Sequence, residues 1–100
     1  MTEKQLTNKI VAALRAEGAW VMKTHTGARN QQPTQKGLPD IIGHVYGYFF
    51  AIEVKLPGKA ATRLQKQTLN EIAQGGAIAD VAWNIEDAMS IMKDAMEGVA

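Results

Sequence analysis

The sequence predicts an α/β protein in which helices flank a small β-sheet. Segments with apolar residues at helical spacing alternate with short runs rich in Ile, Val, Phe and Tyr, in the order helix, strand, hairpin, helix, strand, helix. The 100 residues are 46% apolar and 21% charged, which is ordinary for a folded domain with one modest core. We therefore expect one domain over residues 1–100.

A β-hairpin over residues 37–55 is the central element of this prediction. Its two β-prone runs flank Tyr46 and Gly47, and a turn at that pair places Asp40 opposite Glu53. Lys55 follows Glu53 by two residues, so both side chains project from one face of the strand. Facing carboxylates repel by roughly 0.2 to 1 kcal/mol, and a hard divalent cation such as Mg²⁺ would offset this cost. Lys55 is then placed to stabilise charge on a phosphate.

Capping signals and periodicity predict the other elements. A capping box of Thr2 with Gln5 begins a helix that runs to Gly18, and Asn84 with Asp87 begins the last one. Strands are expected over residues 19–24 and 77–83, a helix over 59–74, and a long loop over 26–36. The last helix carries a stripe that indicates either core packing or a dimer seam: Ile85, Ala88, Met89, Met92, Met96 and Val99.

Composition excludes several classes of protein. Without cysteine there is no disulfide framework and no thiolate metal site. No signal peptide, membrane-length apolar run or Walker-type phosphate loop is present, so we expect a soluble, cytoplasmic protein that uses no nucleoside triphosphate. Residues 1–70 carry a net charge of +6 and residues 71–100 a net charge of −5. This suits a polyanionic partner on one side, although chance asymmetry of solvated helices is the alternative.

The hairpin motifs resemble a known enzyme superfamily. Gly37-Leu38-Pro39-Asp40, followed by Glu53-Val54-Lys55, is similar to the Pro-Asp … Glu-x-Lys signature of PD-(D/E)XK nucleases. Within that superfamily the chain most resembles the VRR-NUC group, whose pattern is also matched by Glu3, Gly47 with Phe49, Gln65 and Gly75-Gly76. The resemblance implies a restriction-endonuclease-like core with a mixed β-sheet, and a DNA endonuclease that depends on Mg²⁺ or Mn²⁺.

The same resemblance implies the roles of individual residues. Asp40, Glu53 and the Val54 carbonyl would hold the metal ion, with Glu3 in support, while Lys55 and Gln65 would act in catalysis. Helical spacing also puts Glu3 in line with buried Leu6 and Ile10, but an acidic residue in a first turn is common on surfaces. One alternative is that Gln65 only forms a capping box with Thr62 and has no catalytic role. Another is that Gln67, and not Gln65, is the catalytic glutamine. His25 is a weaker candidate ligand or base, and His44 weaker still.

DNA is the expected partner. The candidate nucleic-acid-binding residues are Lys23, Arg29, Lys36, Lys59 and Arg63. The resemblance also implies branched DNA such as four-way junctions, with which small stand-alone relatives are associated, and a homodimer would suit that substrate. The expected setting is a bacterial or phage-infected cell. Flap cleavage, nicking, a catalytically silent nucleic-acid-binding module and a purely structural ion pair remain alternatives.

Overall fold

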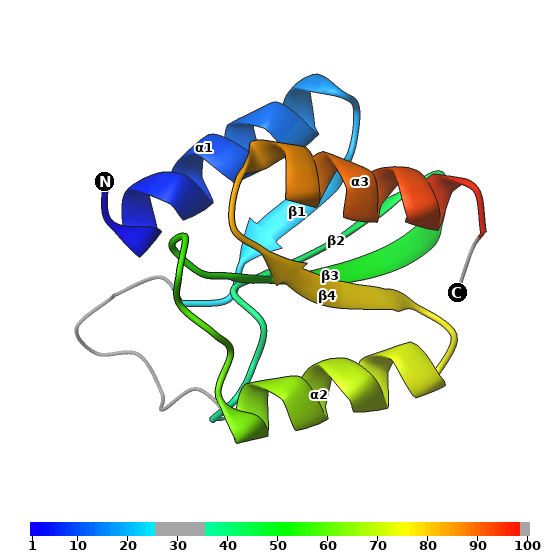
Figure 1. Cartoon of the computed structure of the whole chain (residues 1–100). Helices are drawn as coiled ribbons and strands as arrows, with labels where there is room; N and C mark the ends of the chain where they lie inside the picture. The colour runs from blue at the N-terminus through cyan, green and yellow to red at the C-terminus, as the bar shows by residue number, and fades with distance from the viewer. Residues whose placement is uncertain (26–35, 99–100) are drawn as a thin grey trace.

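The computed structural model describes residues 1–25 and 36–98, and it contains the predicted elements in the predicted order (Figure 1). Their bounds are α1 (Glu3–Ala16), β1 (Trp20–Lys23), β2 (Ile41–Val45), β3 (Tyr48–Val54), α2 (Arg63–Gln74), β4 (Ile78–Ala82) and α3 (Ile85–Met96). The α/β fold class is confirmed. Most of the expected 26–36 loop, including Arg29, lies outside the described residues.

The four strands form one mixed sheet in the order β1-β2-β3-β4. The first three strands are antiparallel, and β4 lies parallel to β3. Tyr46 and Gly47 have φ values of 50° and 81°, which a two-residue type I′ turn requires. Ile41 therefore faces Ile52, as predicted, and the same register places Asp40 beside Glu53.

Helices cover the sheet unequally (Figure 1). Helices α1 and α3 lie on one face, where the alternate residues Phe50, Ile52 and Val54 of β3 are buried against them. Helix α2 lies on the opposite face and packs on β3 and β4. Because α2 does not extend over β1, the side chains of Trp20 and Met22 on that face are exposed.

Side-chain caps fix where the helices begin. The capping boxes of Thr2 with Gln5 and of Thr62 with Gln65 are both present, and Asn84 accepts a hydrogen bond from the Asp87 amide. The predicted start of α2 at residue 59 is wrong, because the Thr62 cap sets the first helical residue at 63.

The methionine stripe of α3 contributes mainly to the core. Met92 is buried and Met89 packs against the core, whereas Met96 is 40% exposed. Val99 lies outside the described residues. None of the helices in the described ranges combines the length and the apolar character needed to cross a membrane.

Candidate active site

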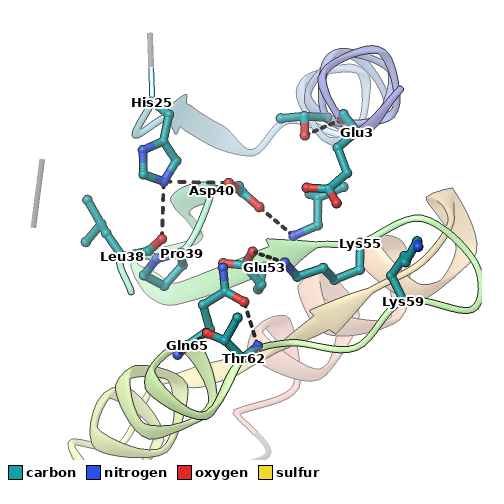
Figure 2. Close-up of polar contacts among 12 residues, drawn as sticks. Glu3, His25, Leu38, Pro39, Asp40, Glu53, Lys55, Lys59, Thr62 and Gln65 are labelled. Carbon is teal, nitrogen blue, oxygen red and sulfur yellow. Dashed lines mark hydrogen bonds and ion pairs between the residues drawn. The ribbon is translucent and has the colours of Figure 1, made fainter. Parts of the chain in front are cut away.

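Two adjacent strands bring the candidate residues to one edge of the sheet. Asp40 immediately precedes β2, Glu53 and Val54 end β3, and Lys55 follows (Figure 2). Asp40 Oδ2 accepts a hydrogen bond of 2.8 Å from the Val54 amide, which ties the two ends of the hairpin together. Asp40, Glu53 and Lys55 therefore converge as the hairpin register requires.

Glu53 is the most unusual group in this cluster. Its side chain is 2% exposed, and in the described part of the chain its Oε1 has no hydrogen-bond donor. Burial, then the charge and hydrogen bond of Asp40, and least of all the charge of Glu3 together raise the pKa of Glu53 to about 8, although Lys55 acts to lower it. Without a cation the Glu53 carboxyl is thus mostly protonated at pH 7.

Lys55 forms an ion pair with Glu53. Its Nζ lies 3.7 Å from Glu53 Oε2, and its side chain is 13% exposed. That distance is longer than a good charge-assisted hydrogen bond, so Lys55 does not fully compensate the buried carboxyl. The unpaired Oε1 beside a second carboxylate fits a divalent cation, whose preferred ligands are carboxylate and carbonyl oxygens.

Two further contacts, made by Thr24 and His25, help to position Asp40. Its carbonyl accepts a hydrogen bond of 2.9 Å from the Thr24 amide, which fixes the end of β1 beside it. The Nε2 atom of His25 lies 3.6 Å from Asp40 Oδ1 and 3.3 Å from the Leu38 carbonyl oxygen (Figure 2). His25 therefore lies beside Oδ1 of Asp40, whereas Oδ2 of the same carboxylate accepts the hydrogen bond from the Val54 amide. His44 lies elsewhere, stacked on Trp20 with 5.7 Å between ring centroids.

Gln65 forms the capping box that the sequence indicated. Its Oε1 accepts a hydrogen bond of 2.8 Å from the Thr62 amide, as the capping box requires. The amide nitrogen is directed toward Glu53 in the view of Figure 2. Gln67 instead donates to Glu71 Oε1 at 3.3 Å along the surface of α2, and so Gln65 is the glutamine at this edge.

Glu3 is not in the buried stripe, and that expectation is wrong. It is exposed in the first turn of α1, and its side chain lines a pocket of about 340 Å³ that also contains Asp40. Within residues 1–25 and 36–98, no three His, Cys, Asp or Glu side chains are grouped closely enough to hold a metal ion. An ion at this site would take two carboxylates, a backbone carbonyl and water, a ligand set common for Mg²⁺.

Two of the candidate DNA-binding residues, Lys23 and Lys59, lie on this side of the molecule. Lys23 lines the pocket next to Asp40, and Lys59 lies beyond Lys55 in Figure 2. Lys36 and Arg63 are exposed. Sequence reasoning missed three pocket residues of α1: Lys4, Thr7 and Asn8. Spacing of one helical turn from Glu3 is the signal that would have found Thr7.

Comparison with known proteins supports the fold. A solved structure described as a VRR_NUC domain is similar to this chain, with a TM-score of 0.68 and 18% sequence identity. The match covers 93% of this chain and 97% of that one. No protein-family profile and no curated protein sequence matches the chain. The fold expected from the resemblance to the VRR-NUC group is therefore confirmed.

Proposed function

We propose that this protein is a divalent-metal-dependent nuclease that hydrolyses phosphodiester bonds in DNA. The observation that carries the proposal is the buried Glu53 carboxyl, which lies beside Asp40 and Lys55 and has an oxygen that no donor among the described residues reaches. A carboxyl group in that state is costly to the fold, and a cation offsets the cost. The structural likeness to a VRR_NUC domain points to the same chemistry.

Asp40, Glu53 and the Val54 carbonyl would hold the ion. Bound there, Mg²⁺ or Mn²⁺ would supply Lewis-acid activation of the phosphoryl group. Glu3 lines the pocket shared with Asp40 and would act through water, because it is exposed and not grouped with the other two carboxylates. His25 would hold the Asp40 carboxylate in position through its contact with Oδ1.

Lys55 and Gln65 would act on the reacting groups. The Lys55 ammonium is a hydrogen-bond donor at the edge of the cluster and would stabilise the negative charge that grows on the phosphoryl oxygens. The side-chain oxygen Oε1 of Gln65 accepts a hydrogen bond from the Thr62 amide, so the side-chain amide nitrogen is the group that would orient a water molecule or a phosphate oxygen. The capping bond fixes the rotamer that such a role requires.

We further propose branched DNA, such as a four-way junction, as the substrate of a homodimer. Trp20, Met22 and Phe49 are 56%, 41% and 43% exposed, and by register they lie on the sheet face that bears α2. An apolar surface of this kind is a candidate pairing surface. Sedimentation of the wild type and of Trp20→Ser at micromolar concentration tests it: a monomeric wild type overturns the dimer.

The function is tested by incubating the purified protein with labelled four-way junction, flap, nicked and linear DNA in Mn²⁺, Mg²⁺ or EDTA. We expect cleavage with Mn²⁺ or Mg²⁺ and none with EDTA. Asp40→Ala should abolish cleavage, because it removes a metal ligand. Asp94→Ala is the matched control, since this exposed aspartate lies near the end of α3, on the sheet face opposite α2.

Separate outcomes contradict separate parts of the proposal. Full cleavage by Asp40→Ala would contradict the assignment of the site. Preference for flap or nicked DNA would replace the junction substrate while retaining the nuclease. Tight DNA binding without any cleavage in Mn²⁺ would indicate a silent binding module.

A further inference from the structure

A pocket beside the candidate active site contains polar groups that the proposed chemistry does not use. It encloses about 340 Å³ between α1 and the end of β1, and Asp40 forms part of its wall. Lys4, Thr7 and Asn8 of α1 and Lys23 of β1 also line it. The pocket therefore opens directly onto one of the two carboxylates.

Lys23 is held in place inside this pocket. Its Nζ donates a hydrogen bond of 2.8 Å to Asn8 Oδ1, which uses one of its three N–H groups and orders a side chain that is otherwise flexible. Within the described ranges, neither Lys4 nor Lys23 forms an ion pair. Their positive charges remain available for an anion.

The backbone fixes Lys23 relative to Asp40. Lys23 pairs with Ile41, the residue after Asp40, and the amide of Thr24 donates to the Asp40 carbonyl. The ammonium group is consequently held on the strand adjacent to the one that Asp40 precedes. An anion bound by Lys23 would lie next to the metal-binding carboxylates and not within them.

The net charge of the site with a divalent cation bound favours the binding of two phosphate groups. Its acidic side chains, Glu3, Asp40 and Glu53, are equal in number to its basic ones, Lys4, Lys23 and Lys55. When ionised they cancel, so a bound divalent cation gives the site a net charge of about +2. One phosphodiester compensates only half of that charge, and a second phosphodiester would complete the balance.

We propose that this pocket binds the phosphodiester next to the one that is cleaved, with Lys23 and Lys4 as its ligands and Asn8 as the residue that positions Lys23. The inference rests on the proposed nuclease function and adds a substrate requirement to it. The enzyme would need a charged linkage on one side of the scissile bond, so it would cut inside a strand far better than it would hydrolyse an isolated phosphodiester.

Single methylphosphonate linkages provide the test, because each removes one phosphate charge and leaves the strand otherwise intact. We would place one at each position around the bond that the wild type cuts in Mn²⁺. At one neighbouring position the neutral linkage should slow the wild type by about tenfold to a hundredfold, the usual value of a hydrogen bond to a charged group. For Lys23→Gln the same linkage should cost less than about twofold, because its partner is already missing.

Two further variants keep the test sharp. Lys4→Gln changes an exposed helical position and avoids the sheet, so it serves if Lys23→Gln folds poorly. Lys9→Gln is the control, since this exposed lysine of α1 does not line the pocket. In Ca²⁺, the dependence of DNA binding on salt should fall in slope by about one for Lys23→Gln and stay unchanged for Lys9→Gln.

The results separate the subsite from the function. If the effects of Lys23→Gln and of the neutral linkage are independent, their rate losses multiply at every position of the linkage. That result would overturn the subsite but leave the nuclease function intact. If the wild type cleaves no DNA in Mn²⁺ or Mg²⁺, the function fails and the subsite fails with it. If the neutral linkage slows cleavage by the wild type at one position only, and does not slow Lys23→Gln there, the result supports both the subsite and the nuclease function.

Discussion

Replacement of Glu53 by Gln should stabilise the metal-free protein, and increasingly so as the pH rises. The carboxyl has an ordinary pKa of 4.5, which the fold raises to about 8. Between these values the unfolded chain loses this proton while the folded chain retains it, so the stability of the wild type falls as pH rises through that window and is level above it. Gln does not titrate, so the stability of Glu53→Gln does not fall in this way as pH rises.

The structure sets the size of this effect. Each pKa unit corresponds to about 1.4 kcal/mol, so the full rise corresponds to at most about 5 kcal/mol at pH 8. Water entry and local relaxation reduce such costs at buried sites, and we expect roughly 1 to 3 kcal/mol. Any penalty for burying the Gln amide is equal at all pH values and cancels when two pH values are compared.

Urea unfolding in EDTA at pH 5 and pH 8 measures the difference. The free energy of unfolding of Glu53→Gln, relative to wild type, should be higher at pH 8 than at pH 5. Glu17→Gln, at the exposed C-cap of α1, should show no such change. A relative stability of Glu53→Gln that is independent of pH, or that falls toward pH 8, would refute the reasoning.

With saturating Mn²⁺ at pH 8, the wild type should become more stable than Glu53→Gln. An ion at a hundred times its dissociation constant stabilises the folded state by about 2.7 kcal/mol. The wild type should gain this stability at pH 8, whereas Glu53→Gln should gain much less because it lacks one ligand. Equal gains would show that the ion binds elsewhere.

Three other substitutions test parts of the site and fold. Lys55→Ala should lower DNA cleavage by about a hundredfold or more while keeping the rise in melting temperature with Mn²⁺, since it removes charge stabilisation but no ligand; loss of that rise would make Lys55 structural. Gln65→Ala and Gln5→Ala each remove a capping box and should each cost about 1 kcal/mol in urea unfolding, but only Gln65→Ala should slow cleavage. Equal activity of the two would leave Gln65 with a capping role alone. Gly43→Ala should destabilise the fold by several kcal/mol, because its Cβ would clash with the Trp20 carbonyl oxygen; an unchanged urea midpoint would contradict this.

Local signals made most of the fold predictable. Thr2, Thr62 and Asn84 identify helix starts because a side-chain cap is a short-range interaction. The hairpin register followed from Tyr46 and Gly47, since a two-residue turn leaves one pairing that buries the right face. The start of α2 was misplaced because residues 59–62 are as compatible with a helix as with the extended lead to its cap.

The candidate site was only partly predictable. Asp40, Glu53 and Lys55 lie within one hairpin, so their convergence depends on local register. Lys4 and Asn8 reach the same edge only because α1 packs across the sheet, a long-range arrangement with no signal in their own neighbourhood. Glu3 was placed on the buried stripe by spacing alone, but it lies in the first turn, where the helix extends past the sheet into solvent.

The tight turn at Tyr46 and Gly47 gives this protein an unusual sensitivity to insertions. The turn lies six residues from Asp40, roughly 20 Å along the strand, and touches none of the acidic groups. One extra amino acid that enters the strand pairing, and is not absorbed by a longer turn, would rotate every later side chain of β3 to the opposite side of the ribbon, sending Glu53 into the apolar interior and Val54 outward. Length at this remote corner would therefore be under tighter constraint than residue identity, and an insertion there would silence the protein without altering any group that takes part in the chemistry.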